Sequence, residues 1–208
     1  MKQYIKYTQS ELDEILTNHD LYLRTRGEKG ECADLSNAYL SNVNLTGVNL
    51  REVNLTGADL SASNLQYAYL SNADLTGIDL TRANLKFAIL YRANLRDADL
   101  SGTNLNNASL YGANLSNAKL HGAVLYNTTL EHADLTGVDL DFSCLPLWCG
   151  SLKANFDDRH IAQFAYHIVR AGLTSKNVSD KTKNELKKII DLANTFHRAT
   201  ECGKIKDD

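Results

Sequence analysis

Leucine recurs at every fifth position of this chain, without a miss, from Leu35 to Leu145. The residue two places before each leucine is small, as in Ala33, Ala38 and Val43, and the residue directly before it is mostly Asp or Asn. This period fits neither an α-helix nor a simple strand, which repeat at about 3.6 and about 2 residues. Each pentad must therefore make one short edge and one turn, with the leucine and the small residue pointing inward. The pattern predicts an all-β solenoid.

The residue directly before each leucine also indicates how many pentads make one coil. At a step of 20 residues, one column contains only acids and amides: Asp34, Asn54, Asp74, Asn94, Asn114 and Asp134. Another column collects the exceptions to that rule: Tyr69, Ile89, Ser109 and Thr129 follow Asn49. A step of 15 scatters the exceptions over all columns. The residues therefore favour four pentads per coil.

The segments on either side of the repeat predict helices that cover the open ends of the solenoid. Thr8 and Glu11 form a capping-box pattern before an apolar face of Leu12, Ile15, Leu16 and His19. Pro146 marks the end of the last coil, because proline cannot donate to a β-ladder. Two further helices are expected, one from Asp157 or Asp158 with Ile161, Phe164, Ala165 and Ile168 on one face, and one from Ser179 or Asp180 with Leu186, Ile189, Ile190, Ala193 and Phe196. The predicted division is an N-terminal helical cap (1–30), the repeat (31–147) and a two-helix C-terminal cap (148–208). An alternative is that one of these apolar faces contacts a second protomer.

Composition and charge narrow the class of protein. The formal net charge of −3 indicates neither a basic nucleic-acid binder nor a strongly acidic protein. No apolar run approaches the roughly 20 residues that cross a bilayer, and the polar start MKQYIKYTQSELDE has no signal-peptide core. Four scattered cysteines suggest reduced thiols. We expect a cytoplasmic protein that does not contact membranes.

Catalytic chemistry is not expected. His121 and His132 fall on different columns of the repeat, and no metal-ligand, phosphate-loop or Ser-His-Asp spacing occurs. The unbroken repeat leaves no inserted loop that could serve as a lid. We therefore predict no enzymatic activity, no cofactor and no metal.

Two outward surfaces are candidates for function. The first is an acidic face, on which neighbouring carboxylates would repel one another or await a basic partner; its residues are Asp34, Asp59, Asp74, Asp79, Asp99, Asp134 and Asp139. The alternative is that Asp and Asn only satisfy backbone groups of the turns. The second is an apolar patch in consecutive coils, typical of an interface: Tyr67, Tyr69, Phe87, Ile89, Tyr91 and Tyr111. Its alternatives are a landing site for the terminal segment 4–7, or tyrosines that stack only to stabilise the fold.

The run ADLSNAYLSNVNLTGVNL (33–50) resembles the A(D/N)LXX repeat of the pentapeptide-repeat family, and the resemblance covers residues 33–145. It implies a right-handed quadrilateral β-helix with four pentads per coil. Some members of this family, the quinolone-resistance proteins, bind DNA gyrase through an acidic surface that imitates duplex DNA. The resemblance therefore raises gyrase as a partner.

Several features of this chain argue against mimicry of DNA. Residues 34–145 contain 11 acidic and 6 basic side chains, and Arg82, Lys86, Arg92 and Arg96 interrupt the acidic field. The protruding loops of the plasmid-borne quinolone-resistance group are absent, and every central residue is leucine where those proteins often use phenylalanine. We predict a rigid protein-binding or scaffold module with an unknown protein partner, forming a homodimer and binding no nucleic acid directly. Binding to gyrase as a DNA mimic is the alternative.

Overall fold

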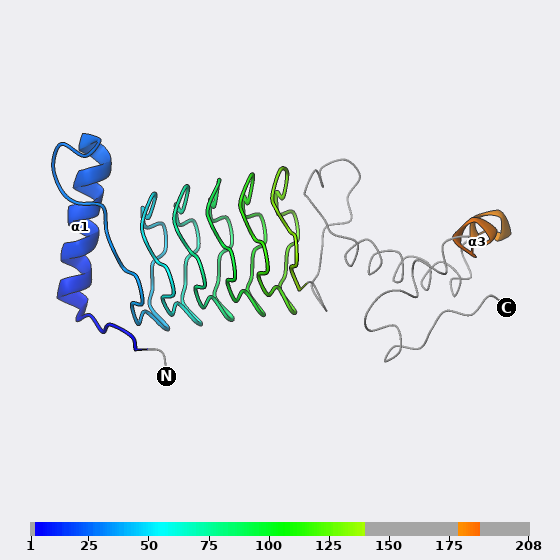
Figure 1. The fold of residues 1–208 in the computed structure, drawn as a ribbon, viewed down its shortest axis with the longest axis horizontal. Coiled ribbons are helices and arrows are strands. Elements are labelled where there is room, and N and C mark those ends of the chain that lie inside the picture. Colours follow the sequence, from blue (N-terminus) through cyan, green and yellow to red (C-terminus); the bar gives the residue numbers. More distant parts are fainter. Residues whose placement is uncertain (1–2, 140–178, 188–208) are drawn as a thin grey trace. The chain divides into compact units, whose positions relative to one another are not determined.

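The structure is a computed structural model that describes residues 3–139 and 179–187. The chain divides into two compact units, Met1–Asn155 and Phe156–Asp208, and each is described by itself. The described part of the first unit is one helix followed by a stack of coils, drawn in blue to green in Figure 1.

Helix α1 spans Gln9–Thr25 and begins at the predicted capping box. The Thr8 side chain accepts a hydrogen bond from the Glu11 N–H, and the Glu11 carboxylate accepts one from the Thr8 N–H at 2.7 Å. These bonds satisfy backbone donors that a helix start leaves without partners. The C-cap of the helix is Arg26, which has a left-handed φ of 55° and is followed by Gly27.

The chain then folds back against α1 before it enters the first coil. Gly30 makes this return possible, because a Cβ at that position would collide with the backbone oxygen of Asn18 and the backbone nitrogen of Tyr22. Its φ of 76° also lies in the region that glycine adopts most readily. A glycine is therefore required here both for space and for backbone conformation.

Successive coils pair at the predicted step of 20 residues. Parallel bridges join Asp34 to Asn54, Asn54 to Asp74, and so on along the stack to the bridge between Lys119 and Asp139. Around each leucine the backbone alternates between donating to the next coil and accepting from it: the Leu35 N–H donates to the Asn54 carbonyl at 2.7 Å, and the Asn54 N–H donates to the Ala33 carbonyl at 3.2 Å. Four pentads per coil is confirmed for the described repeats.

Four faces can therefore be defined by their leucines. Face 1 begins with Leu35, face 2 with Leu40, face 3 with Leu45 and face 4 with Leu50, and each recurs every 20 residues. Coil 1 is residues 33–52, and coils 2, 3, 4 and 5 begin at residues 53, 73, 93 and 113. Within a pentad, positions −1, +1 and +2 relative to the leucine carry the outward side chains.

Each pentad turns through a left-handed residue at position +2. The first turn is closed by a bond from the Ala38 N–H to the Leu35 carbonyl, and Asn37 has a φ of 53°. Positive φ recurs at this position in every turn from Asn37 to Gly137. A four-residue turn with positive φ only at its third residue corresponds to type II geometry, which favours Gly or Asn there. This requirement explains the many Gly and Asn residues of the +2 column.

The interior of the coils contains four columns of leucines, one from each face, with small residues between them. Every leucine from Leu35 to Leu135 is buried, and so are most of the residues at position −2. Ser63, Thr103 and Thr128 stand among those small residues, and the hydroxyl of each donates to the carbonyl of a leucine. Because each inward hydroxyl has a partner, these substitutions cost the core little.

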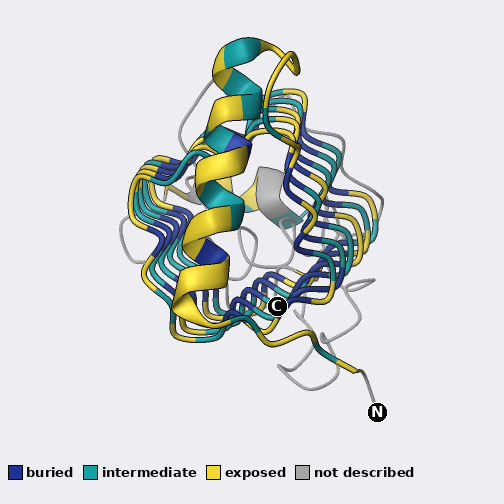
Figure 2. Ribbon diagram, turned by 90° about the vertical axis from the view of Figure 1, so that its left-hand side faces the viewer, coloured by how far each residue is buried: buried dark blue, intermediate teal, exposed yellow. Residues whose placement is uncertain are grey.

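Helix α1 lies across the open end of the first coil, as the view along the stack shows (Figure 2). Leu12 and His19 are its buried residues, and the Ala33 N–H donates to Nδ1 of His19 at 3.0 Å. The segment before α1 extends the β-pairing, since Ile5 exchanges backbone hydrogen bonds with Asn37 and Tyr39 at 2.8 Å each.

In the second unit the described residues form helix α3, Asp180–Lys187. The Lys183 N–H donates to the Ser179 carbonyl at 2.9 Å, which agrees with the predicted start at Ser179 or Asp180. Several predicted features lie outside the described residues. They are the helix expected from Asp157 or Asp158, the part of the last apolar face beyond Lys187, Pro146, and the repeat leucines Leu140 and Leu145. No helix within the described parts of the chain combines the length and apolar character of a membrane span.

Candidate functional site

The aromatic patch is a set of outward side chains in coils 2, 3 and 4. It consists of Tyr67 and Phe87 at the corner between faces 3 and 4, Tyr69 and Ile89 on face 4, and Tyr91 and Tyr111 beyond them in the same face. The step of 20 places the members of each pair in adjacent coils, as the bridge between Tyr69 and Ile89 shows. All six residues of the predicted interface patch are therefore brought together.

The rings of the patch stack along the solenoid. The centroids of Tyr67 and Phe87 lie 5.0 Å apart with planes 3° from parallel, and those of Tyr91 and Tyr111 lie 5.6 Å apart at 11°. Four of the residues are nevertheless well exposed: 54% for Tyr67, 46% for Tyr69, 39% for Phe87 and 37% for Ile89. Tyr91 and Tyr111 are half-buried. Large apolar side chains that are contiguous and exposed mark interaction surfaces.

Two of these rings stand on unfavourable backbone. Tyr67 and Phe87 occupy position +2 of their turns, with φ of 59° and 61°. A residue with a Cβ loses about 1–2 kcal/mol in this conformation, and asparagine tolerates it better. In the next two coils the same column contains Asn107 and Asn127, joined by an amide–amide hydrogen bond of 2.7 Å. The fold therefore accommodates asparagine at this corner, and structure alone does not require the two aromatic residues.

Two cations accompany the patch. Nζ of Lys86 lies 5.8 Å from the centroid of the Phe87 ring, and Cζ of Arg92 lies 5.1 Å from that of Tyr91. The other two cations of these middle coils lie elsewhere: Arg82 is on face 2, and Arg96 is on face 1, where it pairs with Asp97 at 3.1 Å. Sequence reasoning treated Lys86 and Arg92 only as interruptions of an acidic field. Their adjacency to Phe87 and Tyr91 in the chain was the signal that could have assigned them to the patch.

Carboxylates are segregated from this side of the solenoid. Residues 63–72, 83–92 and 103–112, which form faces 3 and 4 of coils 2 to 4, contain no Asp or Glu. Faces 1 and 2 of the same coils contain five: Asp59, Asp74, Asp79, Asp97 and Asp99. In coils 2 to 4, faces 3 and 4 therefore carry the aromatic side chains without a carboxylate, and the two cations of that half, Lys86 and Arg92, both belong to coil 3. Faces 1 and 2 carry the carboxylates.

The predicted acidic face separates into two columns. In face 1, Asp34 and Asp74 are separated by Asn54, whose side-chain amide donates to Asp34 at 2.9 Å; Asp134 is two coils beyond Asn94. In face 2, Asp59, Asp79 and Asp99 are bridged in direct succession, and Lys119 separates Asp99 from Asp139. Only these three carboxylates, which we call the acidic ladder, form an uninterrupted run.

Acids at position −1 have a structural task. Oδ1 of Asp59, Asp79 and Asp99 accepts the backbone N–H two residues further on, at 2.9, 2.9 and 3.0 Å. Burial raises the pKa of Asp99, but hydrogen bonds from Ser101 and Lys119 outweigh it and hold that pKa below its ordinary value. Nζ of Lys119 lies 3.3 Å from Oδ2 of Asp99. The alternative interpretation, in which Asp and Asn satisfy turn backbone groups, accounts for these bonds.

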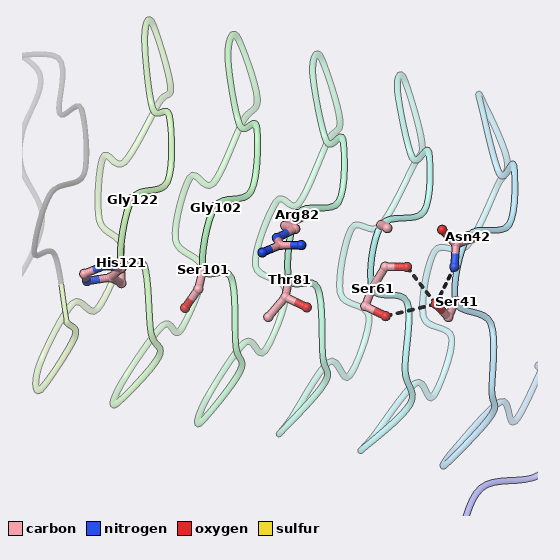
Figure 3. Close-up of a pocket in the computed structure, with 10 residues that line it drawn as sticks. Ser41, Asn42, Ser61, Thr81, Arg82, Ser101, Gly102, His121 and Gly122 are labelled. Carbon is pink, nitrogen blue, oxygen red and sulfur yellow. Dashed lines mark hydrogen bonds between the residues drawn. The ribbon is translucent and has the colours of Figure 1, made fainter.

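An open groove follows the corner between faces 2 and 3 (Figure 3). Its floor is a column of short polar side chains with small residues beside them, and Arg82 and His121 also line it. Hydroxyls at one end are already paired, since Ser61 donates to Ser41 at 3.0 Å and Asn42 donates to Ser41 at 2.9 Å. This arrangement supplies a row of hydrogen-bonding groups along the groove.

The terminal segment does not land on the aromatic patch, so that alternative is wrong. Ile5 pairs with Ala38 at the first coil. The Tyr4 ring meets the Tyr39 ring edge to face at 6.1 Å, and Lys6 lies over Tyr39 at 5.5 Å. The reason is geometric: the first coil has an unpaired edge that can hydrogen-bond to an added strand, whereas the coils of the patch are paired on both sides.

Groups that could hold a metal are absent among the described residues, where no three His, Cys, Asp or Glu side chains gather. His121 lines the groove, while His132 contacts the Tyr111 ring at 5.2 Å, so the two are separate. Cys32 is a free thiol whose Sγ donates to the Glu52 carbonyl at 3.2 Å, and burial raises its pKa. A thiol with a raised pKa is a poor nucleophile.

Comparison with known proteins identifies the repeat. The sequence profile of the family described as pentapeptide repeats matches residues 31–66, 63–102, 88–125 and 113–146, with 8 copies. The chain belongs to the pentapeptide-repeat family. No curated protein matches the chain. Membership of the pentapeptide-repeat family implies the right-handed quadrilateral β-helix, in agreement with the four-pentad coil observed here.

Solved structures of other pentapeptide-repeat proteins are similar to this one. A protein from the thylakoid lumen of Arabidopsis thaliana is 22% identical, with a TM-score of 0.44 over 71% of this chain and 88% of its own. Rfr23 from the cyanobacterium Cyanothece 51142 is 30% identical, with a TM-score of 0.37 over 68% and 95%. QnrB1, a plasmid-mediated fluoroquinolone resistance protein, is 15% identical, with a TM-score of 0.38 over 69% and 75%.

Proposed function

We propose that this pentapeptide-repeat protein is a non-catalytic, protein-binding module whose contact surface is the aromatic patch. The observation that carries the proposal is the pair Tyr67 and Phe87, exposed and stacked on left-handed backbone where Asn107 and Asn127 show that asparagine fits. Strained backbone that retains bulky apolar side chains at the surface is commonest at functional sites. Stacking across three coils also fixes the rings in place, so little side-chain entropy is lost on binding.

Site-specific photo-crosslinking tests this function. A benzophenone side chain replaces Tyr69 at the patch, or Ser101 on the opposite half of the coil, and the protein is irradiated in the cells that make it. We expect a discrete protein adduct from position 69 that is lost in the double variant Tyr67→Asn, Phe87→Asn. Identical adducts from both positions, or adducts that survive the double variant, would contradict the proposal.

The same experiment reports on self-association. An adduct of twice the chain mass would support the homodimer expected from the sequence, and light scattering of the purified protein would give its stoichiometry. A cytoplasmic location stays a prediction from the sequence.

A second candidate, mimicry of duplex DNA towards gyrase, draws support from the acidic ladder of Asp59, Asp79 and Asp99. Three successive carboxylates about 5 Å apart resemble a short run of phosphates. Inhibition of gyrase supercoiling by the purified protein, measured at two salt concentrations, tests this function. Mimicry predicts inhibition that weakens with salt and is abolished by Asp79→Lys with Asp99→Lys; inhibition that neither change affects would count against it.

A further inference from the structure

We infer that the aromatic patch recognises a short acidic protein segment, one that presents carboxylates beside apolar side chains. This inference rests on the proposed binding function and names the chemistry of the partner. It depends on which charged groups of the patch have ion-pair partners and on which ring faces are already covered.

Within residues 3–139 and 179–187, the two cations of the patch have no carboxylate partner. Neither Lys86 nor Arg92 forms an ion pair with another described residue, although Arg24, Arg96 and Lys119 do. The absence of Asp and Glu from faces 3 and 4 of coils 2 to 4 leaves both charges uncompensated on this surface. A partner with carboxylates at matching positions would supply the missing counter-charges and would be steered to this half of the coil.

The size of the patch suits a single segment better than a broad domain surface. It spans three coils, which at the usual separation of paired strands is about 10 Å from first to last. That width is about the diameter of one helix or of two paired strands. Tyr69 and Ile89 lie in the middle and provide the apolar contact, while Lys86 lies in the turn before face 4 and Arg92 in the turn after it.

A second copy of this chain is a poorer occupant. A two-fold axis through the patch centre near Ile89 would place coil 3 opposite coil 3. Lys86 and Arg92 of one copy would then face the same two cations of the other copy, without an acid in either patch to separate them. Juxtaposed like charges disfavour a complex.

Single-stranded nucleic acid is also a poorer occupant. Such binding requires free ring faces on which bases can stack. Here Tyr67 and Phe87 cover each other, as do Tyr91 and Tyr111, while Lys86 and Arg92 lie over the rings of Phe87 and Tyr91. The rings mainly offer their edges and hydroxyl groups, which suit apolar side chains and carboxylates.

Selection from random short peptides displayed on phage tests the inference with the full-length protein as bait. Peptides are kept if they bind the wild-type chain and not the double variant Tyr67→Asn, Phe87→Asn. We expect a consensus of Asp or Glu beside Leu, Ile or Phe. A recovered peptide should lose affinity by about tenfold or more with Lys86→Glu and Arg92→Glu, as expected for hot-spot residues. Selection on this charge-reversed protein should instead recover Lys- or Arg-containing peptides.

Arg82→Glu with Arg96→Glu is the matched control, because it reverses two charges of the same sign in coils 3 and 4, on the opposite half. Its affinity for the recovered peptides should stay close to that of the wild type. Patch-dependent peptides without an acidic consensus would overturn the inference and leave the proposed function standing. No patch-dependent peptide at all would overturn both.

Other occupants are tested in parallel with purified protein. Binding to single-stranded oligothymidine, binding to vesicles of phosphatidylserine and phosphatidylcholine, and dimerisation in light scattering are each compared between the wild type and the double variant Tyr67→Asn, Phe87→Asn. The inference requires all three to be unaffected by that variant. Loss of one of them with the patch would assign the surface to that occupant instead.

Discussion

At the scale of single residues, the turn at position +2 is the most demanding site of the repeat. Ala62 shows the backbone cost of this position without further side-chain contacts, since it has a φ of 55° and a side chain of only one methyl group. Larger residues such as Phe87 meet the same backbone cost but also make contacts of their own. The two contributions can therefore be separated by substitution.

Ala62→Gly should raise the free energy of unfolding by up to about 1 kcal/mol, because glycine accepts positive φ without the clash of a Cβ. The methyl group of Ala62 lines an open groove, so little packing is lost. Urea denaturation followed by circular dichroism measures the change. Ala68→Gly, at a buried inward position, is the control and should lower stability; a lower stability for Ala62→Gly as well would contradict the turn argument.

Asp79 tests the balance between turn hydrogen bonding and charge repulsion. Asp79→Asn keeps an oxygen that can accept the Thr81 N–H, now 2.9 Å from Oδ1, and removes a charge flanked by Asp59 and Asp99. We expect a gain of a few tenths of a kcal/mol that is larger at low salt. Asp79→Ala loses the acceptor and should instead cost about 1 kcal/mol. Urea denaturation at two salt concentrations measures both effects. Equal changes in stability for Asp79→Asn and Asp79→Ala would contradict the role of Asp79 as an acceptor in its turn.

At the scale of elements, α1 depends on one buried histidine. His19 is fully buried, and its Nδ1 accepts the Ala33 N–H. An acceptor at Nδ1 requires the neutral ring. Burial lowers the pKa of His19, and the Arg51 backbone with the Glu52 and Asp20 carboxylates raises it by less.

This lowered pKa makes the attachment of α1 sensitive to acid. The unfolded chain binds a proton at His19 near pH 6.5, before the folded chain does, so stability falls as pH drops from about 6.5 towards the folded pKa. We expect urea denaturation to show lower stability at about pH 5 than at pH 7. His19→Leu, which removes the titrating group, should show a smaller difference between the two pH values; an unchanged difference would exclude His19 as the cause.

The amino-acid pattern predicts elements well where one residue type has one structural task. The capping box of Thr8 and Glu11 is such a case, because the two side chains bond to backbone groups only three residues away. The landing place of Ile5 could not be predicted in the same way. It depends on which edge of the finished solenoid remains unpaired, and that is a property of the assembled coil.

At the scale of the whole molecule, the step of 20 could be predicted because residues 20 apart lie next to each other in adjacent coils. Each outward column therefore tends to keep one type of residue. That register predicts that the six residues of the aromatic patch lie together. The directions of the Lys86 and Arg92 side chains could not be predicted from that register, since a flexible cation can point to either neighbour. Segregation of the carboxylates likewise becomes visible only once coils 2 to 4 are divided into halves.

Stability of the solenoid depends on contacts between neighbouring coils, so a defect in the middle cannot be bypassed. Leu85 is fully buried in coil 3, between coils that pack on both of its sides. Leu85→Ala should cost about 2–5 kcal/mol through the cavity it leaves. Leu85→Asp places a carboxylate where no donor is available, and we expect it to abolish the folded state.

Asn84→Asp is the matched control, because it introduces the same residue one position earlier, on the outward side. Oδ1 of Asn84 accepts the Lys86 N–H at 3.3 Å, and an aspartate oxygen can do the same. Thermal unfolding followed by circular dichroism should show a cooperative transition for this variant and none for Leu85→Asp. If the two variants unfolded alike, the leucine column would not be the core that holds the coils together, and the stabilising contribution would have to lie in the hydrogen bonds between coils.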